Sequence, residues 1–259
     1  MTARTILAMG GGGFTMEPRN PALDDFVLTL SDQAVPRILF LPTASGDPGA
    51  QIAQFQATFA GRACEPRYLS LFRLGREPVP LRDTLLSQDV IYVGGGSMRN
   101  MLAIWRAHGL DGILAEAWER GVVLAGLSAG AMCWFEGGIT TSGGAPAVAE
   151  GLGLLPGSLS VHRDGEPARL PVFRDAVASG ELPGGWAVDD GCALLFRDRA
   201  VSRVVASTAG RGAARIDRVD GGVQEVELAA ELLNAPGGLP LSAPADIREY
   251  RLTRRSASR

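Results

Sequence analysis

A serine flanked by glycines stands at residues 126–130, Gly-Leu-Ser-Ala-Gly, directly after the apolar run Val122–Ala125. A strand, this pentapeptide and then a helix form the arrangement that places a serine hydroxyl on a sharp, exposed turn. An ordinary strand-to-helix turn in a glycine-rich chain gives the same pattern. A serine nucleophile needs a base, usually histidine, and a carboxylate that orients the base. The sequence holds only two histidines, His108 and His162, so the search for a base is short.

The two histidines stand in different contexts. His108 lies between Ala107 and Gly109 after an amphipathic pattern. This predicts a helix C-terminus, where the helix dipole favours histidine and glycine ends the helix. We therefore interpret His108 as structural. His162 follows the segment 158–161 and precedes a polar glycine turn, which predicts a strand end. Catalytic residues of open α/β sheets tend to lie at strand ends, so His162 is the candidate base.

Several carboxylates follow His162. Asp189 and Asp190 stand between two apolar runs, where Asp-Asp-Gly is typical of a tight turn. Such a turn can also deliver a carboxylate to a neighbouring strand end. Asp164 and Glu166 lie on the histidine loop itself and remain alternatives. In each case the chain order is serine, histidine, acid, which differs from the order in α/β-hydrolases and argues against an esterase of that fold.

Short apolar runs alternate with amphipathic helical patterns through the first half of the chain. Apolar strands separated by such helices predict a mostly parallel sheet with helices on both faces. After residue 185, short β-like runs with turns predict antiparallel strands that close one edge. We expect a single α/β domain over residues 1–235 and an irregular tail over 236–259. The predicted parallel strands lie at residues 6–9, 38–41, 90–93 and 122–125.

Two glycine clusters follow predicted strands. Gly10–Gly13 lacks the spacing of a dinucleotide loop, and a chain without lysine has no phosphate-binding Walker lysine. We interpret this cluster as a close-packed turn near the substrate site. Gly94–Gly96 follows a strand that should neighbour the serine strand. Glycines there let backbone N–H groups approach a reacting carbonyl, as an oxyanion hole requires. The alternative is a simple tight turn before a helix.

The composition agrees with an intracellular enzyme, and we expect no metal ion at its site. The chain has 259 residues, of which 46% are hydrophobic, and this is enough to bury a full hydrophobic core. Its net charge is −3. Its arginines are scattered, so we expect no nucleic-acid partner. The three cysteines are widely spaced and predict neither disulfides nor a zinc site. We expect no cofactor. The apolar stretches are too short for a signal peptide or a membrane span, so we expect no membrane partner and a cytoplasmic location.

These motifs, in this order, resemble the peptidase E and cyanophycinase family of serine peptidases. The resemblance covers roughly residues 4–200 and implies a flavodoxin-like, doubly wound fold similar to class I glutamine amidotransferases. It rests on the triple glycine, the serine pentapeptide, the His162 segment, Asp164 to Arg169, and Asp190-Gly191. Each motif alone is weak, and the combination is specific.

The resemblance also implies roles for single residues. The family's triad is serine, histidine and glutamate in this chain order, which matches Ser128, His162 and the position of Asp190. Asp190 is one methylene shorter than glutamate, and the adjacent Asp189 could compete for the role. An oxyanion hole would pair one N–H of the triple glycine, from Gly95 or Gly96, with the N–H of Ala129.

The substrates implied are short peptides, chiefly dipeptides with an N-terminal aspartate. Arg169 is the best candidate for reading the acidic side chain, with Arg174 in reserve and Glu166 in the same segment. Ser97 stands where the family usually carries asparagine, which bears on substrate binding. A cyanophycinase-like isoaspartyl peptidase is the second enzyme hypothesis, and a non-catalytic amidotransferase-like binding module is the third. The expected partners are a short peptide substrate and, at most, a second copy of the chain.

Overall fold

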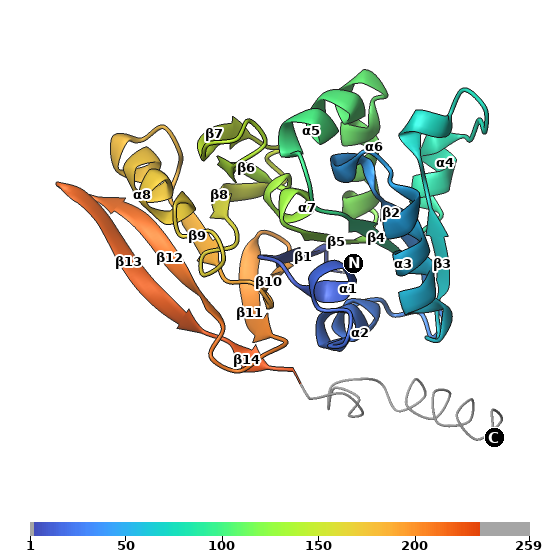
Figure 1. Cartoon of the computed structure of the whole chain (residues 1–259), viewed down its shortest axis with the longest axis horizontal. Coiled ribbons are helices and arrows are strands. Elements are labelled where there is room, and N and C mark those ends of the chain that lie inside the picture. The colour runs from blue at the N-terminus through green and yellow to red at the C-terminus, as the bar shows by residue number, and fades with distance from the viewer. Residues whose placement is uncertain (1–2, 234–259) are drawn as a thin grey trace.

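The computed structural model describes residues 3–233, which form two β-sheets and their covering helices (Figure 1). The main sheet has eight strands in the order β14-β11-β10-β1-β5-β4-β2-β3. Its parallel part contains β1 (Thr5–Met9), β5 (Val123–Leu127), β4 (Val90–Val93), β2 (Arg37–Leu41) and β3 (Glu65–Tyr68). Antiparallel strands β10 (Cys192–Arg197) and β11 (Ala200–Ala206) extend it beyond β1, and β14 (Glu231–Leu232) pairs with β11. The predicted parallel sheet with an antiparallel extension is confirmed. The predicted tail, 236–259, lies outside the described residues.

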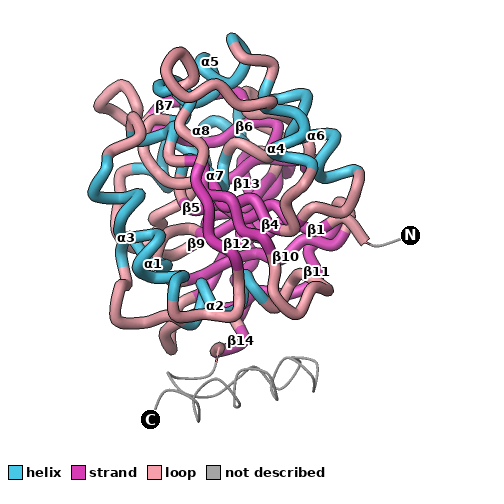
Figure 2. The backbone as a smooth tube through the Cα atoms, turned by 90° about the vertical axis from the view of Figure 1, so that its right-hand side faces the viewer, coloured by secondary structure: helices cyan, strands magenta, loops and turns pink. Residues whose placement is uncertain are grey.

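Helices cover both faces of the main sheet because its strands are apolar on both sides. In β1, Ile6 and Ala8 belong to one core cluster, whereas Leu7 and Met9 belong to another on the opposite face. Figure 2 shows one helix group on each side of the strands. One side holds α1 (Gly13–Met16), α2 (Ala22–Leu28) and α3 (Gly49–Ala60). The other holds α4 (Leu81–Leu86), α5 (Met98–Ala107), α6 (Leu110–Glu119) and α7 (Ala129–Met132).

A second sheet of six strands has the order β13-β12-β9-β8-β6-β7. Helix α8 (Arg169–Ser179) packs on it through Phe173 and Val177, which share a core cluster with Ile139 and Ile216. The strands β6, β8 and β9 run parallel, and their neighbours in the sheet are antiparallel. Their bounds are β6 (Phe135–Thr140), β7 (Ala147–Glu150), β8 (Leu155–Ser160), β9 (Gly185–Val188), β12 (Gly212–Val219) and β13 (Gly222–Ala229).

The sequence analysis predicted one sheet, so this second sheet is a correction. The C-terminal strands β12 and β13 do not close the edge of the main sheet but pair with β9. Glycines interrupt the apolar pattern of β6 and β8, at Gly137, Gly138 and Gly157, and hide these strands from a periodicity analysis. The glycines are there for packing, since a Cβ on Gly138 would lie 2.2 Å from the carbonyl oxygen of Leu159 on the paired strand.

Within residues 3–233 the chain crosses between the two sheets four times, and two of these crossings carry candidate site residues. After β5 of the main sheet it passes through Ser128 and α7 into β6 of the second sheet. After β9 of the second sheet it passes through residues 189–191 into β10 of the main sheet. The serine and acid candidates therefore both stand where the sheets meet.

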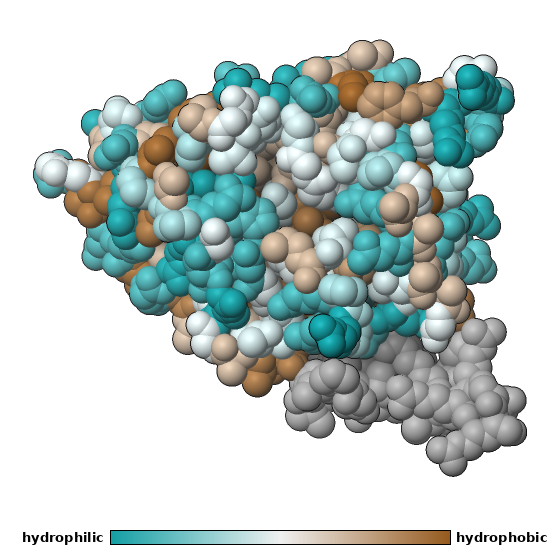
Figure 3. Space-filling view, viewed as in Figure 1, coloured by the Kyte–Doolittle hydropathy of each residue, from teal (hydrophilic) through white to brown (hydrophobic). Residues whose placement is uncertain are grey.

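Across residues 3–233, no helix is long and apolar enough to cross a membrane. Hydrophobic side chains appear on the face drawn in Figure 3 as small separate patches among polar residues.

Candidate active site

Ser128 lies on a strained turn between β5 and α7. Its backbone has φ 54° and ψ −114°, a region that non-glycine residues rarely adopt, and its N–H donates to the carbonyl oxygen of Met9 at 3.1 Å. The flanking glycines make the turn sterically possible. A Cβ on Gly126 would lie 2.1 Å from the carbonyl oxygen of Gly130, and one on Gly130 would lie 2.5 Å from that of Val93. Such strain, stabilised by packing, is typical of a nucleophile elbow.

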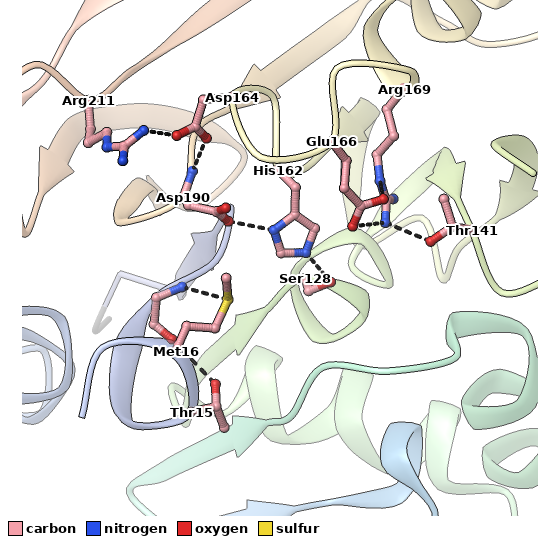
Figure 4. Close-up of polar contacts among 11 residues, drawn as sticks. Thr15, Met16, Ser128, Thr141, His162, Asp164, Glu166, Arg169, Asp190 and Arg211 are labelled. Carbon is pink, nitrogen blue, oxygen red and sulfur yellow. Dashed lines mark hydrogen bonds and ion pairs between the residues drawn. The ribbon is translucent and has the colours of Figure 1, made fainter. Parts of the chain in front are cut away.

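His162 reaches Ser128 from the second sheet. It follows β8, has φ 56°, and its side chain is 11% exposed. Its Nε2 lies 2.8 Å from Ser128 Oγ, and its Nδ1 lies 2.5 Å from Asp190 Oδ1. Figure 4 shows the imidazole ring between the serine hydroxyl and the carboxylate. The candidate nucleophile, base and orienting acid are thus within hydrogen-bonding distance in one chain of contacts.

The adjacent acid, Asp189, points elsewhere. Its carboxylate accepts bonds from Arg163 Nε at 2.7 Å, from Arg163 Nη2 at 3.1 Å and from the N–H of Gly212 at 2.9 Å. The ion pair raises the pKa of Arg163. Asp189 therefore joins the histidine loop to β12, and Asp190 is the acid that meets His162.

Asp164 binds the backbone of Asp190 and not the imidazole of His162. Its Oδ1 accepts the Asp190 N–H at 2.8 Å, and its other oxygen pairs with Arg211 (Figure 4). Asp164 was an alternative orienting acid, and the structure gives it this backbone contact instead.

The glycine loops pack directly around the reacting groups. A Cβ on Gly95 would lie 3.3 Å from Ser128 Cβ, and Gly96, at φ 137°, packs against the carbonyl of Ala44. Ala129 begins α7, and the first N–H groups of a helix have no acceptor within it. Of the oxyanion-hole candidates, Gly95 and Ala129 thus lie next to the serine, whereas Gly96 contacts Ala44 and Ser45. Gly11 of the first glycine cluster also lies at the site, since a Cβ there would be 3.0 Å from His162 Nδ1.

Glu166 and Arg169 form a pair beside His162. Arg169 Nε donates to Glu166 at 2.8 Å, Nη2 donates to Glu166 at 3.2 Å and to Thr141 Oγ1 at 3.0 Å, and Nη1 donates to the Ile139 carbonyl at 2.5 Å. The Arg169 side chain is 4% exposed, and that of Glu166 is 41% exposed. The hydrogen bond from Arg169 lowers the pKa of Glu166. Glu166 thus presents an ionised carboxylate next to His162.

The remaining binding candidates have other contacts. Arg174 pairs with Glu225 of β13 at 2.5 Å, and the structure does not bring it to the triad. Ser97 caps α5 by accepting the N–H of Asn100 at 3.2 Å. His108 is the C-cap residue of α5, the structural position that the sequence predicts. Cys133 is fully buried, and burial raises the pKa of its thiol well above the usual value, so it is no competing nucleophile.

Comparison with known proteins decides the family. The model of peptidase family S51 matches residues 6–204. The chain belongs to peptidase family S51. An uncharacterized peptidase of Bacillus subtilis (strain 168), YgaJ, is 44% identical over 230 residues, covering 89% of this chain and 99% of that protein. The chain is thus a serine peptidase of the peptidase E type, as the resemblance in the sequence implied.

Two solved structures share the fold of this chain. A peptidase from an acI-B1 Actinobacterium matches with a TM-score of 0.63 at 20% identity, covering 88% of this chain and 95% of that one. A candidate peptidase E of Listeria monocytogenes EGD-e matches with a TM-score of 0.55 at 14% identity, covering 88% of this chain and 100% of that one. At these identities the likeness concerns the fold alone, and it confirms the predicted fold class.

The structure adds site residues that sequence reasoning did not assign. Thr141 anchors Arg169, and Arg211 anchors Asp164. Neither carries a sequence signal, because both reach the site through contacts between distant segments. Among the described residues, no group of three or more histidine, cysteine, aspartate or glutamate side chains could hold a metal ion.

Proposed function

We propose that this S51 peptidase hydrolyses short peptides as an exopeptidase, through a triad of Ser128, His162 and Asp190. The observation that carries the proposal is the chain of contacts from Ser128 Oγ to His162 Nε2 at 2.8 Å and from Nδ1 to Asp190 at 2.5 Å. A serine hydroxyl is a weak nucleophile until an adjacent base accepts its proton.

The triad would act in two steps. Ser128 Oγ attacks the peptide carbonyl while its proton passes to His162 Nε2. The tetrahedral intermediate then collapses, the C–N bond breaks, and His162 returns the proton to the leaving amine. Water, deprotonated by the same imidazole, hydrolyses the acyl-enzyme and regenerates Ser128. Asp190 holds Nδ1–H throughout and stabilises the imidazolium.

The oxyanion would lie between the N–H of Ala129 and an N–H of the Gly95-Gly96 loop. Backbone donors fixed by packing stabilise the developing negative charge without reorganising during the reaction. The close approach of Gly95 to Ser128 supports this placement.

We keep dipeptides with an N-terminal aspartate as the first substrate candidate, with Arg169 as the reader of the acidic side chain. To bind it, the Arg169 guanidinium must exchange its contact with Glu166 for the substrate carboxylate. A neutral N-terminal residue is the second candidate. It is favoured by the same ion pair, which presents a negative rather than a positive group to the site.

A panel of α-aspartyl, β-aspartyl and neutral dipeptides, with one ester, tests the function. We expect peptide hydrolysis by the wild type and a loss on the order of 10⁶-fold in kcat for Ser128→Ala, since triad members act as a unit. His162→Ala should lose as much, and His108→Ala should match the wild type. Full activity in Ser128→Ala would refute the nucleophile, and β-aspartyl cleavage alone would select the isoaspartyl hypothesis.

Glu166→Gln separates the two substrate candidates. It removes the carboxylate that competes for Arg169, so kcat/KM for aspartyl dipeptides should rise relative to neutral ones if Arg169 reads the acid. An unchanged ratio would remove Arg169 from that role.

A further inference from the structure

The glycine loop 10–13 contacts two sets of side chains on its opposite sides. On one side it lies against His162 and Asp190. On the other side it lies against the carboxyl group of Asp24, a residue of α2 that is 1% exposed. The loop follows β1, the strand next to the serine strand, and leads into α1.

The contacts on the catalytic side are close. A Cβ on Gly11 would lie 2.0 Å from Asp190 Oδ1, so the Gly11 backbone forms the floor under this carboxylate oxygen. The carbonyl oxygen of Gly11 accepts the N–H of Gly191 at 3.2 Å, which ties the loop to the residue after the acid. Beside it, the backbone of Gly12 contacts the Met16 sulfur at 3.2 Å and the Thr15 hydroxyl at 3.4 Å (Figure 4). A shift of this loop would move the Asp190 carboxylate.

The contacts on the buried side hold the loop in place. Asp24 accepts the backbone N–H of Phe14 and, at 3.3 Å, the hydroxyl of Tyr92. Gly13, at φ 59°, fits directly above this pair, because a Cβ there would lie 2.7 Å from the Tyr92 hydroxyl and 3.1 Å from Asp24 Oδ1. Tyr92 is itself fully buried on β4, among the rings of Phe14, Phe40, Phe55 and Phe59.

Burying a carboxyl group in the core costs free energy of solvation. Burial raises the pKa of Asp24 to about 7, against the opposing effect of Arg62. A hydrophobic residue in an aromatic core avoids this cost, so the carboxyl is expected where its hydrogen bonds fix a geometry.

We propose that Asp24 and Tyr92 are positioning residues for the triad acid, holding the glycine loop 10–13 so that Gly11 sets the place of the Asp190 carboxylate against His162. This inference rests on the proposed triad. Neither side chain touches the reacting atoms, and both act through the backbone of Gly11 to Phe14.

The test compares variants of the two residues with a matched surface control. Asp24→Ala removes both hydrogen bonds, Tyr92→Phe removes one hydroxyl, and Asp24→Asn keeps an acceptor of the same shape. Asp25→Asn, at the next position, changes a side chain that pairs with Arg62 at the surface. Each variant is measured for kcat, KM, thermal unfolding, and the NMR signal of the His162 Nδ1–H proton.

We expect kcat of folded Asp24→Ala to fall by about 10²-fold with KM unchanged, the loss typical of a small displacement of catalytic groups. Its Nδ1–H signal should move upfield as the bond to Asp190 lengthens. Tyr92→Phe should show the same changes to a smaller extent, Asp24→Asn should restore most of the rate and the signal, and Asp25→Asn should match the wild type.

Unchanged kcat and an unchanged Nδ1–H signal in folded Asp24→Ala and Tyr92→Phe would overturn the proposal, even if both variants unfold at lower temperature. The NMR signal does not depend on turnover. A wild type that cleaves no peptide would therefore refute the proposed function, while the proton signal would still decide the positioning role.

Discussion

Asp189 and Asp190 are sequence neighbours with opposite surroundings, and this difference predicts opposite phenotypes. Asp190→Asn should leave the fold intact and reduce kcat by on the order of 10⁴-fold, because an amide favours the wrong imidazole tautomer. Asp189→Asn should leave kcat of the folded enzyme near that of the wild type. It should lower the free energy of unfolding by about 3 kcal/mol, since it leaves the partly buried Arg163 without one carboxylate.

Peptide hydrolysis and urea unfolding of the two variants measure these effects. A large loss of kcat in Asp189→Asn with an unaffected Asp190→Asn would move the role of the acid to Asp189. Asp190→Glu is a third probe. Because Gly11 and Gly165 pack against the two carboxylate oxygens, an added methylene has little room, and we expect partial activity.

At the level of elements, the loop between β4 and α5 should hold one of the N–H donors that stabilise the oxyanion. A Cβ on Gly95 would lie 2.8 Å from Leu127 Cδ1 and 3.3 Å from Ser128 Cβ. Gly95→Ala should therefore push the loop away from the serine and lower kcat by about 10²-fold, the loss typical of one displaced oxyanion donor. Thermal unfolding should change little, because the first clash is with the flexible end of a leucine side chain.

Gly112→Ala is the matched control for this substitution. Gly112 lies in α6, and a Cβ there meets no atom within 4 Å. Alanine should raise the free energy of unfolding by about 0.5–1 kcal/mol through its helix propensity, with kcat unchanged. An unchanged kcat in Gly95→Ala as well would place the oxyanion donors elsewhere.

The same elements show what the sequence could predict. The strands of the parallel sheet, the serine turn and the choice of His162 as the candidate base follow from apolar runs, glycine spacing and the small number of histidines. The choice of Asp190 among the nearby carboxylates came from the family resemblance. The second sheet does not follow from such patterns, because β6 and β8 carry glycines where a strand pattern needs apolar residues. The contact of Arg174 with Glu225 and the cap made by Ser97 were also missed. The Arg174 contact depends on which helix face meets β13, which is not encoded locally. The Ser97 cap has a local signal, a serine directly before a helix, but the sequence analysis assigned Ser97 to substrate binding.

At the level of the whole molecule, the triad depends on how two sheets are joined. Ser128 ends a strand of the main sheet, His162 follows a strand of the second, and Asp190 lies in the turn that connects β9 to β10. The ion pair between Arg163 and Asp189 and the N–H of Gly212 on Asp189 tie the histidine loop, this turn and β12 together. A change in how the two sheets pack against each other would therefore change the distances among Ser128, His162 and Asp190.

The buried carboxyl of Asp24 makes the stability of the molecule depend on pH. Its pKa is about 7 in the folded protein against 3.8 for an ordinary aspartate, with burial as the main cause. Arg62 lowers this pKa, whereas Asp25 raises it, and the Tyr92 hydroxyl bonds to the carboxyl. The folded state thus binds a proton that the unfolded state releases between pH 3.8 and about 7. The contribution of this group to stability is complete below that window and is lost as pH rises through it.

The slope of this loss is about 1.4 kcal/mol per pH unit within the window. Asp24→Asn cannot ionise, so the difference in the free energy of unfolding between the wild type and this variant should change by roughly 2–3 kcal/mol from pH 5 to pH 7, in favour of the variant at the higher pH. Urea unfolding of both proteins at both pH values measures it. Parallel pH profiles for the wild type and Asp24→Asn would show that Asp24 is already ionised in the folded protein, with Arg62 outweighing its burial.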